Sequence, residues 1–240
     1  MKKFVLCGLS VFIAGAVFAA DSAAEVKAAA KKLADKGNYS WKSTTGAGGG
    51  GGAGGGRGRG FGGGPTEGKV ADGVTYLTTT RGENTTEVVL QGTKGAIKLQ
   101  DGWQSISEAG EGQGPGRFIG RMYQDFKAPA AQAEELAGQV KELKKDGDAY
   151  SGVLTEEGAK SRLTFGRRRA GGDGPEISDA KGTAKFWVKD GVLSKYEYNV
   201  QGSMSFNGND RDINRTTTVE IKDVGATKVT VPDEAKKKLS

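Results

Sequence analysis

Residues 184–200 read AKFWVKDGVLSKYEYNV, and this stretch decides the fold. The pair Asp190-Gly191 separates two runs in which apolar and polar residues alternate. Asp-Gly between two such runs is a strong hairpin signal, because both turn residues need positive φ. The apolar positions are Ala184, Phe186, Val188, Tyr196, Tyr198 and Val200. The stretch therefore predicts a β-hairpin with one buried and one solvent face, and Trp187 is an aromatic exception on the polar face.

Strand-like runs extend outward on both sides of this hairpin. On the N-terminal side they cover residues 38–45, 74–80, 85–91, 96–100 and 103–107, and Asp101-Gly102 provides another Asp-Gly hairpin signal. In the C-terminal half they cover residues 149–154, 161–165, 203–206, 215–222 and 228–231. Short strands separated by turn residues are typical of an antiparallel meander. The sequence therefore predicts two meanders that form one large curved sheet.

Apolar residues recur at helical spacing in the segments around these meanders. Ser22 and Glu25 form a capping-box pattern at the start of one such segment, which stops at Gly37. Two more helices are expected between the meanders, at residues 118–126 and 129–147, and a short one follows residue 232. The prediction is an α+β fold in which amphipathic helices cover the apolar face of a large curved antiparallel sheet.

The N-terminus has the pattern of a secretory signal peptide. Met1-Lys2-Lys3 precedes an apolar run, Phe4–Phe18, and small residues follow. We expect cleavage after Ala19, with Ala20 as the second choice. A retained membrane anchor is the alternative, but the run is short for a hydrocarbon layer of about 30 Å. The sequence therefore predicts a periplasmic or secreted protein.

Composition removes several kinds of chemistry. The only cysteine is Cys7, inside the expected signal peptide, and the chain contains no histidine. The mature chain would therefore lack disulfides, thiolate metal ligands and the commonest general base. Its net charge would fall from +6 to +4 when Lys2 and Lys3 leave, which is too mild to indicate a polyanionic partner. The sequence contains no recognisable catalytic set or metal cluster, so we expect a protein without enzyme activity, cofactor or metal.

Residues 46–65 contain 14 glycines. Such a stretch buries too few side chains to offset the entropy of ordering it. We therefore expect a signal peptide at 1–19 and a single domain at 20–240, with residues 46–65 as a disordered loop insert. Arg57 and Arg59 near its end resemble an RNA-binding box. Two arginines give few phosphate contacts, and export takes the chain away from RNA, so we expect no nucleic-acid partner.

Three local features add to the order of helix, meander, helix pair, meander and helix. They are the amphipathic segment before the first strand, the hairpin at 186–196, and the ending VEIKDVG (219–225) followed by VTVP (229–232). Together they resemble the LolA-like family of periplasmic lipoprotein carriers and its LppX/LprG-type relatives. The resemblance implies an unclosed β-barrel with a helical lid over an apolar cavity that holds acyl chains. The glycine-rich insert departs from the family, and no residue is matched to the buried arginine with which LolA holds its lid.

Two groups of residues are candidates for contact with such a ligand. Side chains of the apolar hairpin face are expected to line a cavity, and the alternative is an ordinary filled core; they are Phe186, Val188, Tyr196 and Tyr198. Three adjacent cations are expected to contact lipid phosphates, and the alternative is a solvated hairpin tip; they are Arg167, Arg168 and Arg169.

We interpret the chain as an exported periplasmic or cell-envelope binding protein. It would shield a lipid or acyl chain between the sheet and its helices, and it would contact an envelope membrane. One alternative is a structural or interaction protein with a filled core and a glycine-rich contact loop. Another is a carbohydrate-acting enzyme, which would need two carboxylates about 5–10 Å apart across one cleft.

Overall fold

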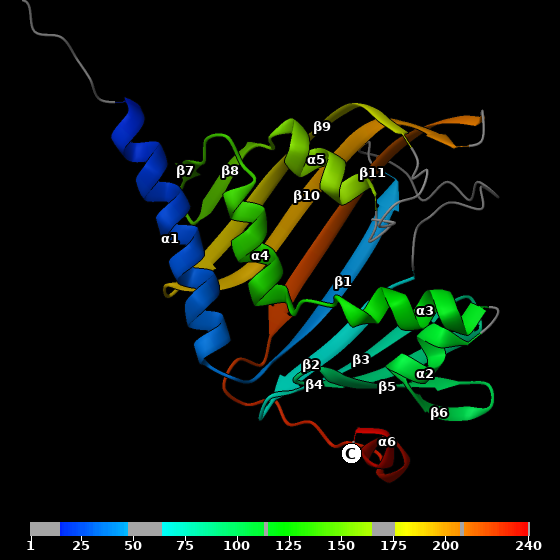
Figure 1. Ribbon diagram of the computed structural model, residues 1–240. Helices are drawn as coiled ribbons and strands as arrows, with labels where there is room; N and C mark the ends of the chain where they lie inside the picture. Colours follow the sequence, from blue (N-terminus) through cyan, green and yellow to red (C-terminus); the bar gives the residue numbers. More distant parts are fainter. Residues whose placement is uncertain (1–14, 48–63, 113–114, 165–175, 207–208, 240) are drawn as a thin grey trace, which may run out of the picture.

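The computed structural model describes residues 15–47, 64–112, 115–164, 176–206 and 209–239. Its elements, in chain order, are α1 (Gly15–Asp35), β1 (Tyr39–Ala47), β2 (Thr66–Ala71), β3 (Val74–Arg81), β4 (Asn84–Gln91), β5 (Lys94–Leu99), β6 (Gly102–Ser105), α2 (Ile106–Glu111), α3 (Pro115–Gln124), α4 (Pro129–Gly138), β7 (Lys144–Asp146), β8 (Ala149–Val153), α5 (Glu156–Leu163), β9 (Glu176–Lys189), β10 (Val192–Phe206), β11 (Asn209–Lys222) and α6 (Asp233–Leu239). The strands form one 11-stranded sheet, which confirms the predicted α+β class (Figure 1).

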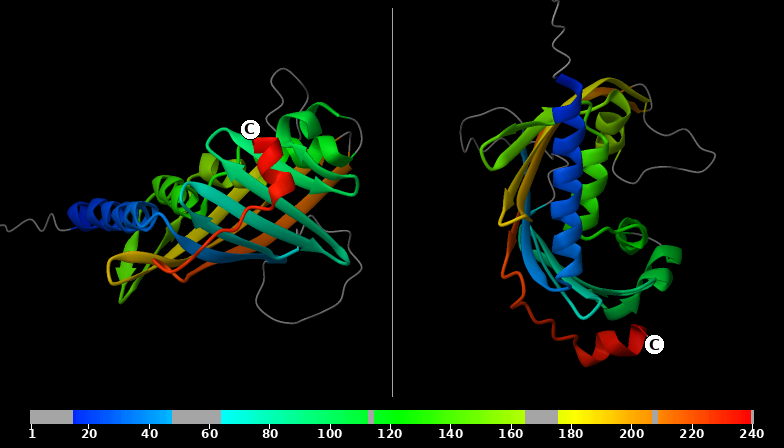
Figure 2. Two further views of the ribbon diagram at one scale, coloured as in Figure 1. Left: turned by 90° about the horizontal axis from the view of Figure 1, so that it is seen from below. Right: turned by 90° about the vertical axis from the view of Figure 1, so that its left-hand side faces the viewer.

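The sheet is antiparallel throughout, in the order β6-β5-β4-β3-β2-β1-β11-β10-β9-β8-β7. β1 lies in the middle, between β2 and the late strand β11, so it joins the two meanders. One row of facing residues runs through this junction, from Ile221 to Trp41 to Gly68. The sheet curves without closing, and β6 and β7 form its edges (Figure 2).

Asp-Gly pairs with positive φ at both residues make two of the hairpin turns. Asp190-Gly191 has φ values of 53° and 72°, as the sequence predicts for the turn between β9 and β10. Asp72-Gly73 makes the same turn between β2 and β3, with φ values of 52° and 74°. At Asp101-Gly102 the expectation of positive φ at both residues is wrong, because only the glycine has it, at 103°. Gly102 pairs with Leu99. It occupies the left-handed bulge position that often follows a type I turn.

Helices cover the concave face in two groups (Figures 1 and 2). α1, α4 and α5 lie over the half of the sheet that contains β8, β9 and β10, and α1 packs directly against α4. α2 and α3 pack on each other over the half that contains β5. The two groups are joined by the short segment between α3 and α4, which crosses the concave face (Figure 1).

The terminal helix α6 lies on the opposite, convex face, whereas the sequence pattern placed the helices on one apolar face (Figure 2). It packs against β5 and β6 and completes a second buried cluster, formed by Val89, Ala96, Trp103, Ala235 and Leu239. Alternation explains this cluster, because Val88 faces the main core while its neighbour Val89 must face the other way. The convex face also carries Trp187, which the sequence predicts on the polar face. The ammonium groups of Lys185 and Lys195 lie 5.0 and 4.7 Å from the centre of its ring.

Several predicted boundaries are wrong for a common reason, which is that local spacing does not show where a segment will pair. Residues 161–163 end helix α5 instead of starting a strand, because Thr155 caps that helix by accepting from the Gly158 amide at 3.0 Å. The helix expected at 129–147 ends at Gly138. Beyond it, the amide of Lys141 donates to the carbonyl of Val153 at 2.9 Å, and the chain turns into β7.

The remaining differences lie at element ends. α1 begins at Gly15, before the expected cap at Ser22, and its first residues are mostly alanine and other small residues. β1 continues through Gly46 and Ala47, where it pairs with β11, and residues 48–63 of the expected loop insert lie outside the described residues. Residues 228–231 form no strand, and β2 and α2 have no counterpart among the predicted elements.

Candidate functional site

The concave floor is apolar across the N-terminal half of the sheet. A single row of facing residues crosses β1 to β5, and it consists of Trp41, Gly68, Leu77, Val88 and Ile97. All five are buried. Position 68 requires a glycine, because a Cβ there would lie 2.0 Å from the Trp41 ring atom Cζ2. The indole therefore lies flat on the floor of the sheet.

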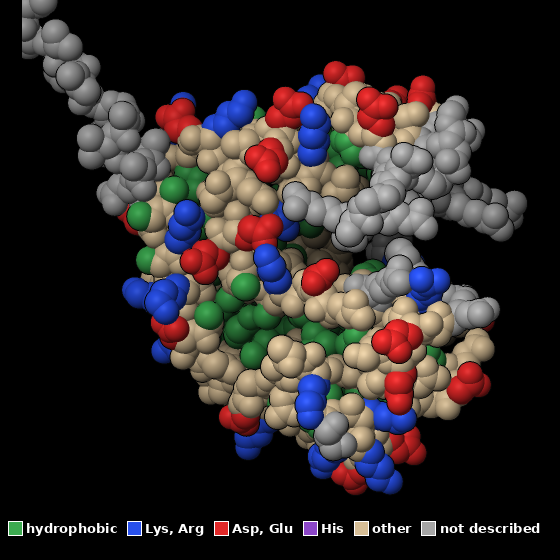
Figure 3. All heavy atoms as spheres, viewed as in Figure 1, with side chains coloured by type: hydrophobic (Ala, Val, Ile, Leu, Met, Phe, Trp, Pro, Cys, Tyr) green, Lys and Arg blue, Asp and Glu red, His purple; other side chains and the backbone are tan. Residues whose placement is uncertain are grey.

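A hollow of about 560 Å³ lies beside this floor, between the ends of β3, β4 and β5 and the helices α2 and α3. Figure 3 shows apolar side chains exposed in a depression on this side of the molecule. Leu90, Ile106, Tyr123, Phe126 and Ala128 provide its apolar wall. Its polar rim contains Thr75, Thr93, Lys94, Ser105, Ser107, Gln124 and Lys238. The volume is within the range of about 300–1,000 Å³ that is typical of small-molecule sites.

Phe126 separates this hollow from a smaller one of about 120 Å³. Its ring stacks on Trp41 at a centroid distance of 6.4 Å and packs against Tyr123 at 6.2 Å. The smaller hollow is also bordered by Trp41, Gln132 and Tyr196, so it reaches the floor beneath the start of α4. Phe126, on the segment between α3 and α4, therefore borders both spaces.

Hydrogen bonds between hydroxyl groups connect α3 to the floor. These hydroxyl groups form a polar band next to the aromatic residues. Thr66 and Thr79 share a hydrogen bond of 2.9 Å across β2 and β3, and Thr79 also contacts the Tyr123 hydroxyl at 3.2 Å. Burial raises the pKa of Tyr123, so this phenol stays neutral and keeps its hydrogen bond at physiological pH. A strip of hydroxyl groups thus lies beside the apolar wall.

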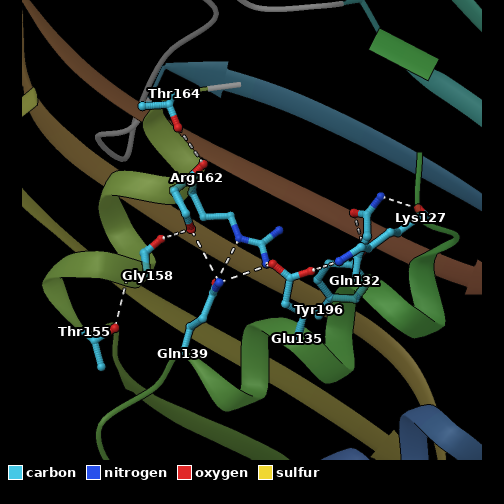
Figure 4. Close-up of polar contacts among 10 residues, drawn as sticks. Lys127, Gln132, Glu135, Gln139, Thr155, Gly158, Arg162, Thr164 and Tyr196 are labelled. Atoms are coloured by element: carbon cyan, nitrogen blue, oxygen red, sulfur yellow. Dashed lines mark hydrogen bonds and ion pairs between the residues drawn. The ribbon is translucent and has the colours of Figure 1, made fainter. Parts of the chain in front are cut away.

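Two buried tyrosines of the floor anchor the start of α4. The hydroxyl of Tyr196 donates to Gln132 Oε1 at 3.1 Å, and the side-chain Nε2 of Gln132 donates to the carbonyl of Lys127 at 2.6 Å (Figure 4). The hydroxyl of Tyr39 accepts from the Ala130 amide at 3.5 Å. These bonds compensate for the missing side-chain cap of α4, whose first residue is Pro129. They also hold the segment that carries Phe126.

Burial of Tyr39 predicts a loss of stability in alkaline solution. Burial raises its pKa to about 12, whereas an unfolded tyrosine ionises near pH 10. The stabilisation from neutral Tyr39 is therefore complete below pH 10 and is lost as the pH rises toward 12. Between pH 9 and pH 11.5 we expect the free energy of unfolding of the wild type to fall about 2 kcal/mol further than that of Tyr39→Phe. Urea denaturation at both pH values measures this, and equal falls in the two proteins would contradict it.

An arginine cluster joins α4, α5 and the floor. Arg162 of α5 donates to Gln139 Oε1 at 3.1 Å and to Glu135 Oε1 at 3.3 Å, both on or next to α4 (Figure 4). Its guanidinium also lies 5.7 Å from the ring centre of Tyr198. From the floor, the buried Arg215 of β11 donates to the carbonyl oxygen of Arg162. Burial lowers the pKa of Arg215, and the guanidinium holds the end of α5 against the sheet.

The structure places the four hairpin candidates in different surroundings. Phe186 and Tyr196 are 0% and 1% exposed and stack at 6.4 Å within the filled core. Val188 is half-buried against that core, and Tyr198 is half-buried under Arg162. Of the four, only Tyr196 borders one of these two hollows, the smaller one. Arg167, Arg168 and Arg169 lie outside the described residues.

Sequence reasoning did not single out the walls of the larger hollow or Arg215. Leu90 was within a predicted strand, and Tyr123 and Phe126 were within a predicted helix, but nothing local shows that they face one space. Arg215 had a usable signal, because it alternates in phase with the buried Thr217, Val219 and Ile221. A cation in phase with a buried strand face indicates a buried charge with a partner.

No group of three or more His, Cys, Asp or Glu side chains among the described residues is placed to hold a metal ion. Within the same described ranges, no helix has the length and apolar character needed to cross a membrane.

Fold and site together define an unclosed half-barrel of α+β class with a hollow between its concave face and its helices. No protein-family model matches the chain, and no curated protein matches its sequence. Two solved structures are similar in fold. The Mycobacterium tuberculosis lipoprotein LppX is 14% identical with a TM-score of 0.44, over 85% of this chain and 94% of that one. LprF from Mycobacterium bovis is 12% identical with a TM-score of 0.41, over 90% and 98%.

LppX is also one of the relatives named for the resemblance of the sequence pattern. At 14% and 12% identity the likeness concerns the fold alone. The site of this chain is therefore interpreted from its own residues.

Proposed function

We propose that the protein is an exported cell-envelope binding protein that shields the apolar part of a lipid or acyl ligand. The ligand would occupy the hollow beneath α3 and not the filled core beneath α1, α4 and α5. Binding would come from burying the ligand's apolar surface, at about 25 cal/mol per Å².

The observation that carries this proposal is the hollow of about 560 Å³ with its apolar wall and polar rim. Side chains would normally fill a space of this size, because protein interiors pack as densely as organic crystals. Here the larger hollow lies beside α2 and α3, next to the buried row of Leu77, Val88 and Ile97, and only the smaller hollow lies beneath α4. A concave space that combines an apolar wall with a few polar groups is the default position for a ligand.

Export remains part of the proposal. It rests on the basic start and apolar run of residues 1–19, with the single domain of residues 20–240 acting after cleavage in the periplasm or outside the cell. The domain would include the glycine-rich insert as a loop. Contact with an envelope membrane, through Arg167, Arg168 and Arg169, is proposed from their charge alone.

The test is native mass spectrometry of the mature protein purified from an envelope extract, followed by solvent extraction of any bound molecule. We expect a lipid-sized mass on the wild type and its loss from Leu90→Glu, which places a charge in the apolar wall. Thr75→Phe is a second variant, which fills part of the hollow without burying a charge. Val153→Glu is the matched control, because Val153 is 54% exposed and does not border the hollow.

A clean unliganded mass for the wild type, together with no uptake of an added fluorescent acyl probe, would contradict the proposal. The alternative would then be an envelope structural or interaction protein. If only Leu90→Glu loses the ligand and its far-ultraviolet circular dichroism shows unfolding, Thr75→Phe decides the outcome. Full binding by a folded Thr75→Phe protein would place the ligand elsewhere.

A further inference from the structure

The charged side chains that line the larger hollow are all positive. Its lining contains two lysines, Lys94 and Lys238, and no aspartate or glutamate. Thr93, which precedes Lys94 in the chain, and Ser107 of α2 also line the hollow. An ammonium group and a hydroxyl are both donors, so this end of the hollow offers a ligand hydrogen bonds to accept.

The two lysines differ in their existing partners. Lys238 of α6 lies 3.5 Å from Glu108 Oε2, and both side chains are solvent-exposed, so the pair contributes little to stability. Among the described residues, no carboxylate forms an ion pair with Lys94. Counting Glu108, the rim retains one net positive charge where an apolar space opens.

The positions of the lysines also indicate an orientation. Lys94 and Lys238 border only the larger hollow, whereas Phe126 borders both hollows. Lys94 begins β5 directly after the turn from β4, at the end of the sheet, and Phe126 lies over the centre of the floor on Trp41. A ligand with its polar end at the lysines would therefore direct its apolar end along Leu90 and Ile106 toward Phe126.

We propose that the hollow selects an amphiphile with an anionic end group, such as the carboxylate of a fatty acid. Lys94 and Lys238 would bind the anionic group, and the chain would lie against the apolar wall. This inference rests on the proposed function, and it adds the chemical class and the orientation of the ligand. Charge-assisted hydrogen bonds are about twice as strong as neutral ones, so the anionic end should determine selectivity.

The test compares three ligands on the full-length mature protein. Dodecanoate, dodecan-1-ol and acetate each compete at pH 8 with the neutral fluorophore N-phenyl-1-naphthylamine, whose emission rises in apolar surroundings. We expect dodecanoate to displace the fluorophore at about one-tenth of the concentration that dodecan-1-ol requires. Acetate, which has the charge without the chain, should not displace it. The difference between the two long-chain ligands should shrink at high salt concentration, because Lys94 is exposed and the Lys238 side chain is 39% exposed.

Variants assign this selectivity to the two lysines. In Lys94→Gln/Lys238→Gln the ratio should fall to about one, because the affinity for dodecanoate drops while that for dodecan-1-ol stays the same. Lys185→Gln/Lys195→Gln, which removes two lysines from the convex face beside Trp187, is the matched control and should keep the wild-type ratio.

The outcomes separate the two proposals. If neither long-chain ligand binds the wild type, the proposed function fails and this inference fails with it. If both bind with equal affinity, or if Lys94→Gln/Lys238→Gln keeps the ratio, the inference is overturned while an apolar binding site remains. Displacement by acetate alone would indicate a simple anion site and would also overturn it.

Discussion

Replacing Trp41 by alanine is expected to lower the free energy of unfolding by about 3–5 kcal/mol. Trp41 is 4% exposed and lies on β1, the strand that joins the two halves of the sheet. Its ring contacts Tyr39 and Phe126, so the substitution would leave a cavity at the junction of floor and helices. Urea denaturation of the variant and the wild type, followed by circular dichroism, measures the difference. A loss below about 1 kcal/mol would show that the indole is not part of a tightly packed core.

Gly68 makes this prediction more specific. A Cβ there would meet the Trp41 ring at 2.0 Å, so Gly68→Ala should destabilise the wild type by about 1–3 kcal/mol. In the Trp41→Ala background the same change should cost nothing, because the clashing ring is gone, and alanine orders a strand better than glycine. A double-mutant cycle compares the two values. Equal costs in both backgrounds would contradict the close contact between the indole and β2.

Phe186→Ala is expected to lower the free energy of unfolding by a similar amount, about 3–5 kcal/mol, without changing ligand affinity. The ring of Phe186 is fully buried and stacks on Tyr196, beneath the helix group that includes α1 and α4. It borders neither hollow, so its loss removes core packing and no ligand contact. Denaturation gives the stability change, and fluorophore binding at a temperature where the variant is folded gives the affinity.

The result for Phe186 also tests the role that the hairpin pattern predicted for it. A folded Phe186→Ala protein that has lost ligand affinity would show that the ligand binds at the apolar face of the hairpin, which is the site that the sequence pattern predicts. Phe126→Ala is the useful comparison, because Phe126 borders both hollows and its removal should change ligand affinity. Opposite responses of these two phenylalanines would separate the filled half of the concave face from the open half.

Local patterns in the sequence were sufficient for the hairpin of β9 and β10. The alternation of Phe186 and Tyr196 with lysines and glutamate requires one buried face, and Asp190-Gly191 requires a tight turn between them. Both are properties of neighbouring residues, so they can be read without knowing the fold. The mid-chain change to helical spacing was also visible, and α3 and α4 occur where it was found. The predicted α+β class followed from these local features.

Tertiary structure alone decided which part of the apolar face is filled and which is open. Phe186 and Leu90 both face the concave side of strands, but α1 and α4 cover the half of the sheet that contains Phe186, while α2 and α3 leave space beside Leu90. That difference depends on how helices pack over distant strands and on Gly68, which lets the Trp41 ring lie flat. The lysines at the rim come from β5 and α6, which are more than a hundred residues apart in the chain. Periodicity shows which face of a strand is apolar, but only the three-dimensional packing determines what covers that face.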